Sequence, residues 1–201
     1  LLFVGVLGAV AHLYGQFPGV PPAKWSKAAP FPEPEEELYG VSANGKMYVI
    51  GGYGVNGVPV GMLWEYDPAT DKWTKKTSMP HPAHHAGLAE YRGKLYVFGG
   101  YTLYQGAGWE PIDNAWEYDP AKDSWKALAP LPGKRGSPLA VEVNGQIYVI
   151  GGAVPEPGTN EVAVFPNRAA RSVGTNEAYD PATNKWTTRS SMPTPRNHAF
   201  A

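Results

Sequence analysis

The chain of 201 residues carries 17 basic and 18 acidic side chains, which leaves a net charge of −1 at pH 7. A charge so evenly balanced provides no basic surplus to hold a phosphate backbone, so nucleic acid is not expected as a partner. The 24 glycines, 21 prolines and 12% aromatic residues, with no long stretch of helical periodicity, favour an all-β chain. The absence of cysteine excludes disulfide bonds.

The first segment, residues 1–11, is apolar and ends in the small-x-small pattern of Ala9-Val10-Ala11. This pattern is typical of a signal-peptidase site, so we predict a truncated signal peptide at 1–11, followed by a lead-in at 12–24. An apolar strand or the tail of a membrane anchor are the alternatives. No other segment has the roughly 20 apolar residues that span a bilayer, so no stable membrane span is expected in the mature chain. The predicted localisation is the periplasm or the exterior of a bacterial cell.

From residue 25 onward, four landmarks recur at fixed spacings. They are an apolar run that ends in a double glycine, a Tyr-Asp-Pro triplet, a tryptophan seven residues after that tyrosine, and a proline seven residues after the tryptophan. The double glycines begin at Gly51, Gly99 and Gly151, the triplets at Tyr66, Tyr118 and Tyr179, the tryptophans are Trp73, Trp125 and Trp186, and the prolines are Pro80, Pro132 and Pro193. Trp25 and Pro32 begin a partial copy at the front. A period of about 50 residues indicates a repeat architecture.

Each copy predicts four antiparallel strands, here called a to d. Strand a follows the proline, strand b ends at the double glycine, strand c ends at Tyr-Asp-Pro, and strand d contains the tryptophan. Dipeptides such as Asn44-Gly45 predict tight a–b hairpins with positive φ, and Asp-Pro predicts a type I turn between c and d. The double glycine indicates a sharp turn or a close backbone approach, and the repeated Tyr and Trp are expected to fill the space between adjacent sheets as large wedges.

With these landmarks and the Arg196-Asn197-His198 element, residues 25–201 resemble a kelch-repeat β-propeller. The resemblance implies an incomplete ring of three full four-stranded blades with flanking strands, a strand d at 25–32 and the start of a strand a at 196–201. The expected blades span approximately residues 35–77, 83–128 and 135–190. The complete ring would have six or seven blades, and the chain would be the N-terminal half of a longer protein.

In such a blade, the b–c and d–a connections emerge on one face. The segments between Gly-Gly and Tyr-Asp-Pro lengthen from 53–65 to 101–117 and 153–178, and long variable loops on a rigid scaffold commonly bind ligands. The candidate ligand-binding residues on this face are Tyr53, Asn56, His81, His84, Tyr101, Tyr104, Trp109, Arg135, Arg168, Arg171 and Arg196. They suit a sugar, an acidic small molecule or a peptide equally well. The alternative is that these loops only cover blade edges, and that repeated arginines such as Arg135 bond carbonyls of a neighbouring strand.

The run His81-Pro82-Ala83-His84-His85 is a candidate zinc or copper site. However, His85 occupies the same repeat position as Ser137 and His198, and strand alternation predicts His84 and His85 on opposite faces. We therefore predict no bound metal and no cofactor.

The chain has no Gly-x-Ser-x-Gly elbow, His-Glu-x-x-His motif or phosphate loop. Among the functions that the resemblance implies, we favour an exported binding or interaction scaffold for a carbohydrate or protein ligand, and not an enzyme. A periplasmic sugar epimerase or mutarotase similar to N-acetylneuraminate epimerase is the main alternative. A galactose-oxidase-like copper enzyme is less favoured, because its Cys–Tyr cross-link cannot form in a segment without cysteine.

Overall fold

The computed structural model describes residues 24–106, 108–158 and 170–200, and their regular structure is entirely β. The strands are β1 (Glu36–Ala43), β2 (Lys46–Tyr53), β3 (Pro59–Asp67), β4 (Lys72–Lys75), β5 (Gly87–Tyr91), β6 (Lys94–Phe98), β7 (Tyr101–Tyr104), β8 (Gly108–Pro111), β9 (Ala115–Asp119), β10 (Ser124–Ala127), β11 (Leu139–Val143), β12 (Gln146–Ile150), β13 (Ala153–Pro155), β14 (Ala170–Ser172), β15 (Asn176–Asp180) and β16 (Lys185–Thr188). Among these residues, no helix is long and apolar enough to cross a membrane.

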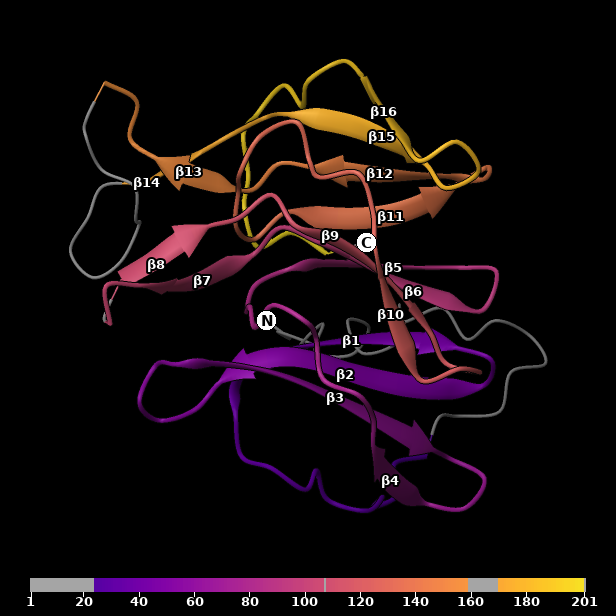
Figure 1. Ribbon diagram of the computed structural model, residues 1–201. Helices are drawn as coiled ribbons and strands as arrows, with labels where there is room; N and C mark the ends of the chain where they lie inside the picture. Colours follow the sequence, from indigo (N-terminus) through magenta and orange to yellow (C-terminus); the bar gives the residue numbers. More distant parts are fainter. Residues whose placement is uncertain (1–23, 107, 159–169, 201) are drawn as a thin grey trace, which may run out of the picture.

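Twelve of these strands form three four-stranded antiparallel sheets. Blade 1 has the order β1-β2-β3-β4, blade 2 the order β5-β6-β9-β10, and blade 3 the order β11-β12-β15-β16. The first strands β1, β5 and β11 are neighbours at the centre, and the blades fan out from them (Figure 1). The prediction of an incomplete propeller with three four-stranded blades is confirmed.

The turns within each blade adopt the predicted conformations. Asn44 and Gly45 have φ angles of 52° and 74°, the left-handed pair that a two-residue hairpin requires. In the first c–d turn, the Asp67 carbonyl accepts a hydrogen bond from the Thr70 amide at 3.3 Å, and its carboxylate accepts one from Ala69 at 2.9 Å. Asparagine and aspartate therefore hold these turns through their own backbone and side-chain chemistry.

The double glycine follows the last residue of strand b in blades 2 and 3, whereas β2 of blade 1 continues through it to Tyr53. At these glycines the chain passes close to the connection to the next blade. Gly99 has a φ of 61°, and a Cβ atom placed there would lie 2.5 Å from the carbonyl oxygen of Arg135. A Cβ at Gly151 would collide in the same way with the carbonyl of Arg196. Only glycine permits this approach, as the pattern predicts.

Adjacent blades pack through the repeated tyrosines. Tyr118 of blade 2 is fully buried, with its ring centroid 6.3 Å from that of Tyr48 in blade 1. Tyr179 of blade 3 is fully buried against Phe98 of blade 2, at 5.7 Å. Burying each large side chain stabilises the fold by roughly 1.5–3 kcal/mol, so these wedges hold the blades together as predicted.

A second contact between blades uses the repeated tryptophan. The Trp125 Nε1 donates a hydrogen bond to the Thr77 carbonyl at 2.8 Å, and the Thr77 amide donates to the Asp123 carboxylate at 2.9 Å. We call this pair of bonds the Trp clasp. It recurs with equivalent residues, which are Trp73, Ala29 and Asp71 in blade 1 and Trp186, Ala129 and Asn184 in blade 3.

The described part of the segment predicted as strand d, from residue 24, is not paired in a sheet, so a strand at residues 25–32 stays a prediction. Strand d pairs with strand c of its own blade, and no strand c lies beside this segment among the described residues. The segment instead packs on the outside of blade 1. Phe31 contacts Trp73 at 5.0 Å between ring centroids, and Ala29 completes the Trp clasp.

Trp125→Phe is expected to lower the free energy of unfolding by about 1–2 kcal/mol, because the clasp loses its indole donor and the Thr77 carbonyl loses its partner. The measurement is urea unfolding followed by circular dichroism. Trp25→Phe is the matched control, since Trp25 is a repeat-equivalent tryptophan that is 101% exposed. Equal effects of the two substitutions would contradict a stabilising clasp.

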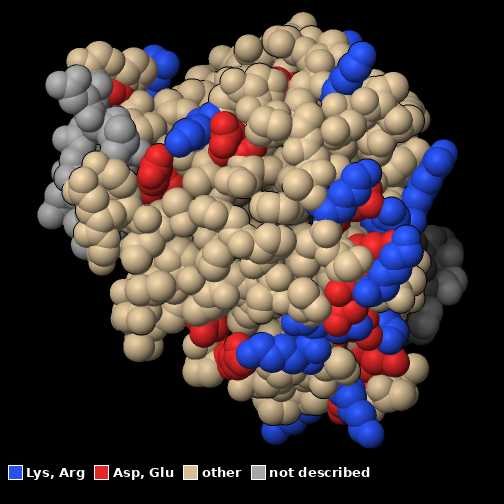
Figure 2. Space-filling view, in the orientation of Figure 1, with Lys and Arg blue, Asp and Glu red and all other residues tan. Residues whose placement is uncertain are grey.

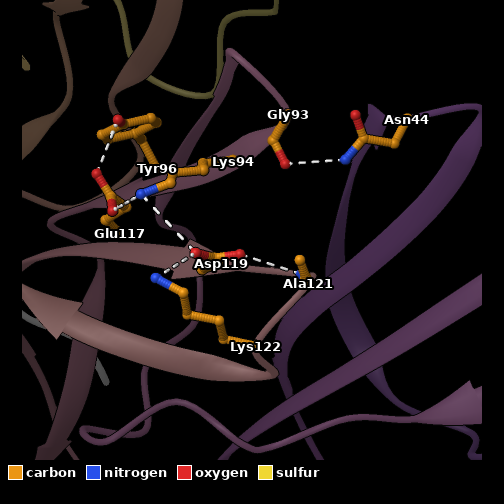
Figure 3. A network of polar contacts seen from close by, with 8 residues as sticks. All are labelled: Asn44, Gly93, Lys94, Tyr96, Glu117, Asp119, Ala121 and Lys122. Atoms are coloured by element: carbon orange, nitrogen blue, oxygen red, sulfur yellow. Dashed lines mark hydrogen bonds and ion pairs between the residues drawn. The ribbon is translucent and has the colours of Figure 1, made fainter.

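A polar network lies on strands b and c of blades 1 and 2. In blade 2, Glu117 accepts hydrogen bonds from Lys94 at 2.5 Å and from the Tyr96 hydroxyl at 2.9 Å (Figure 3). Blade 1 repeats this arrangement, but blade 3 has Gln146 and Ala178 in place of the lysine and glutamate. Figure 2 shows the two signs of charge interspersed on this side of the molecule. Blade 3 lacks both members of this lysine–glutamate ion pair. We therefore interpret the pair as a surface feature of the scaffold.

Candidate functional site

The b–c and d–a connections lie on one face, which we call the hairpin face. His84, between β4 and β5, forms a β-bridge with Tyr101 at the start of β7, and Gly136 forms one with Ala153 at the start of β13. The β7–β8 and β13–β14 hairpins project together on the left of Figure 1, whereas the a–b and c–d turns lie on the right. Rigid sheets thus present the longest and least similar connections together.

Four of the predicted ligand-binding residues meet on this face as an aromatic–histidine cluster, formed by Tyr53, His84, Tyr101 and Trp109. The His84 ring lies 4.9 Å from Tyr53, 4.5 Å from Trp109 and 5.7 Å from Tyr101 between centroids. Tyr53 and Trp109 are 5.5 Å apart and half-buried, while His84 and Tyr101 are buried beneath them. The cluster joins blade 1 to blade 2 and offers an aromatic surface with a polar ring below it.

The expectation that His84 and His85 point to opposite faces is wrong. Their rings are in contact, and their Nδ1 atoms are within hydrogen-bonding distance of each other. His85 has a φ of 56° and lies outside any strand, so the alternation of a β-strand does not apply to it.

His85 belongs to an axial cluster of four residues at equivalent repeat positions. Its members all have φ between 51° and 56°, and they are Glu37, His85, Ser137 and His198. The Ser137 amide donates to the His85 carbonyl at 2.8 Å, and the His198 amide donates to the Ser137 carbonyl at 3.1 Å. The side chains also pair, His85 Nε2 with Glu37 Oε2 at 3.1 Å and Ser137 Oγ with His198 Nε2 at 3.2 Å. These bonds link successive blades around the centre.

Burial disfavours charge on the two contacting histidines. It lowers the pKa of His84 to about 4 and that of His85 to about 3, with the neighbouring His84 and His198 adding to the shift at His85. Both rings are therefore neutral at pH 7. The contact between His85 and Glu37 is then not an ion pair between two full charges, and one histidine donates a hydrogen bond to the other.

Arg135 points into the protein. Its Nη2 lies 2.7 Å from the Glu177 carboxylate and donates to the Val149 carbonyl at 3.3 Å. The expectation that this repeated arginine bonds a carbonyl of a neighbouring strand is confirmed. Arg196, at the equivalent position, is exposed.

The remaining predicted residues are spread over the hairpin face and do not join the aromatic–histidine cluster in any contact that the structure shows. Asn56 and Arg171 are exposed, and His81 and Tyr104 are half-buried. Arg168 lies outside the described residues, as do the segments predicted as signal peptide and lead-in up to residue 23. Binding by each of these residues stays a prediction.

In the described ranges, no three His, Asp or Glu side chains are arranged to hold a metal ion. Glu37 and His198 lie beside His85, but they and the two contacting rings of the His81–His85 run do not form such a group. Metal and cofactor binding therefore find no support in the described geometry.

Sequence reasoning overlooked Glu37 and Glu177 as site residues. Glu37 could have been found by counting five residues from Pro32, which places it at the position of His85. Glu177 could have been found by counting two residues back from Tyr179, where the other copies have Trp64 and Trp116. In both cases the signal is a polar residue at a position whose repeat partners were already known.

Comparison with known proteins agrees with this geometry. Residues 21–201 match the family model described as the KLHDC2/KLHL20/DRC7 Kelch-repeats domain. Kelch-like protein 25 of Xenopus tropicalis is 35% identical over 74 residues, which are 37% of this chain and 12% of that protein. The F-box/kelch-repeat protein At1g67480 of Arabidopsis thaliana is 33% identical over 88 residues, 44% of this chain and 20% of that protein.

Among solved structures, that of YjhT superposes with a TM-score of 0.67 and 18% sequence identity. The match covers 87% of this chain and 57% of that chain, so this chain spans little more than half of a protein with the same fold. With a family model matched along nearly its whole length and three blades built on the repeated landmarks, the chain belongs to the kelch-repeat β-propeller family.

Proposed function

We propose that this chain is the ligand-recognising part of an exported kelch propeller, a scaffold that binds a carbohydrate or a protein through its hairpin face. The observation that carries the proposal is the aromatic–histidine cluster. Tyr53 and Trp109, half-buried and 5.5 Å apart, come from the b–c connections of two different blades. Aromatic surfaces held in place by a rigid scaffold, with a few polar groups, are typical of recognition sites.

Export rests on the apolar, small-x-small segment at residues 1–11. It is tested on the full-length protein by fractionation of the producing cell and by sequencing the mature N-terminus. Processing after Ala11 supports export, and an unprocessed protein in the cytosol would contradict it.

Binding is tested with a glycan array and purified candidate proteins on the full-length protein. Trp109→Ala is expected to lower the affinity for the recognised ligand by about tenfold or more, because a central aromatic contact is lost. Trp25→Ala is the control, since this tryptophan is fully exposed and makes no contact with the aromatic–histidine cluster that the structure shows. Affinity that survives both Trp109→Ala and Tyr53→Ala would overturn the assignment of this face.

A sugar epimerase or mutarotase is the second candidate, and the axial cluster is the observation that favours it. His85 with Glu37, and His198 with Ser137, place proton donors and acceptors together at the centre of the propeller. Polarimetry on freshly dissolved sugars decides between the two functions. Accelerated mutarotation that is lost in His198→Ala would replace the scaffold proposal, whereas glycan binding without turnover supports it.

A further inference from the structure

Blade 3 differs from blade 2 at two repeat positions where it carries buried charged residues, and blade 1 has Glu35 at one of these positions. Two residues before the repeated tyrosine, blades 1 and 2 have Trp64 and Trp116, but blade 3 has Glu177. In blade 2, Ala83 precedes the first strand and shares an apolar cluster with Trp116. The position equivalent to Ala83 in blade 3 is Arg135. An alanine and a tryptophan have thus been replaced by an arginine and a glutamate.

The charged pair is buried but its hydrogen-bonding capacity is not filled. The Arg135 and Glu177 side chains are only 3% and 7% exposed, and Nη2 lies 2.7 Å from Oε2. That contact lacks the alignment of a hydrogen bond, and neither Glu177 Oε2 nor Arg135 Nε has a hydrogen-bond partner among the described residues. Buried polar atoms are nearly always satisfied, so a donor and an acceptor left side by side indicate a place for a polar ligand.

A cavity of about 260 Å³ lies over this pair, on the hairpin face. Its walls include Val154 and Val173, which are apolar, and the Lys134 and Thr175 side chains. Gly152, with a φ of 105°, leaves room for the Arg135 side chain, because a Cβ atom there would lie 3.3 Å from Arg135 Cδ. The cavity is slightly smaller than typical ligand pockets, which measure about 300–1,000 Å³, so it suits no more than one ring-sized molecule.

The charges in and around the cavity are balanced. Arg135 faces Glu177 on the floor, and Lys134 at the rim is held by Glu110 at 3.0 Å. An anionic ligand would have to compete with a glutamate for each basic side chain. A cationic ligand would have to compete with a basic side chain for each glutamate. The site therefore favours a neutral ligand that offers a donor and an acceptor next to each other, as adjacent hydroxyl groups do.

We propose that this cavity binds a single neutral sugar ring, with adjacent hydroxyl groups hydrogen-bonded to the Glu177 carboxylate and the Arg135 guanidinium and the ring's C–H face against Val154 and Val173. Hydrogen bonds to charged groups are stronger than neutral ones, which gives a small polar ligand useful affinity. The inference deepens the proposed function and rests on it, since it names one ligand class for the hairpin face.

The experiment titrates the full-length protein with methyl glycosides of glucose, galactose, mannose and N-acetylglucosamine by ligand-observed NMR and calorimetry. At least one glycoside is expected to bind, and Glu177→Gln is expected to lower the affinity for that glycoside by about tenfold or more. The double substitution Arg135→Ala with Glu177→Trp copies blade 2, so it keeps a folded blade and is expected to abolish sugar binding. Glu33→Gln, the same change on blade 1, is the control and leaves affinity unchanged.

Several outcomes overturn the inference. One is that no neutral glycoside binds, another is that only the anionic methyl glucuronide binds, and a third is that the blade 2 copy binds as well as the original. A ligand that depends on Trp109 and persists in the blade 2 copy, with no glycoside bound by the original protein, would remove the sugar pocket and leave the scaffold function in place. Loss of every ligand in the original protein would remove both.

Discussion

Arg135→Ala alone is expected to lower the free energy of unfolding by about 3–5 kcal/mol, because it leaves the buried Glu177 carboxylate without its cation. Adding Glu177→Trp is expected to restore stability to within about 1 kcal/mol of the original protein, or to exceed it. Replacing a buried ion pair by well-packed apolar groups is often neutral or stabilising. In this chain, the apolar alternative is the arrangement that blade 2 already has with Ala83 and Trp116.

Urea unfolding at pH 7 of the original protein, both single variants and the double variant measures the coupling between the two sites. Glu177→Trp alone is expected to be destabilising as well, since it places a large ring beside an uncompensated guanidinium. Single substitutions that cost less than about 1 kcal/mol each, or a double variant as unstable as Arg135→Ala, would contradict a buried pair that replaces an apolar one. The same proteins serve the sugar-binding experiment, so stability and recognition are separated within one set.

Lowering the pH from 7 to 5 is expected to remove about 2 kcal/mol of stability for each of His84 and His85, at 1.36 kcal/mol per pKa unit below the ordinary histidine value of about 6.5. The folded pKa values are lowered to about 4 and about 3 by burial, so the folded protein keeps both rings neutral in this range. The unfolded chain binds protons as the pH falls through 6.5. Protons therefore favour unfolding, and stability rises with pH over this window.

The pH window of 7 to 5 separates the histidines from two hydrogen-bonded carboxylates. Glu65 and Glu117 have pKa values lowered below 4.5, with hydrogen bonds from Lys and Tyr side chains opposing their desolvation, so their contribution is lost only at lower pH. His84→Gln with His85→Asn is expected to flatten the slope of stability against pH, and asparagine tolerates the left-handed φ at 85. Glu37 and His198 face His85 and remain in this variant. His81→Gln, on the same connection, is the control, and an unchanged slope in the double variant would contradict the assignment.

The scaffold was predictable because its landmarks have local physical causes. Positive φ at Asn44-Gly45 and the close approach at Gly99 follow from turn chemistry and from the missing side chain of glycine. Each cause acts within a few residues and recurs at fixed spacing, so one copy confirms the next. The wedge role of Tyr118 followed in the same way, since a large ring at a fixed offset in every sheet has to fill a repeated interface.

The site was only partly predictable, because it depends on contacts between copies. That His84, Tyr53 and Trp109 meet could be expected from their shared face, but the contact between His84 and His85 could not. His85, a left-handed residue just before strand a, does not follow the alternation that the pattern assumes. Glu177 was overlooked because the sequence analysis looked for residues that recur in every copy. At this position blade 3 has a glutamate where the other two blades have a tryptophan.

The passage of each double glycine under the following connection has a consequence for how such a chain can be rearranged. Gly99 touches the backbone of Arg135, and Gly151 that of Arg196, so an individual sheet is interlocked with residues that lie after its own last strand. A portable module therefore has to extend past the Leu-Pro or Met-Pro that follows its sheet, to include the third residue after that proline. Engineered splices at the prolines would separate each double glycine from the carbonyl it touches, whereas junctions after that third residue would keep the contact within one module.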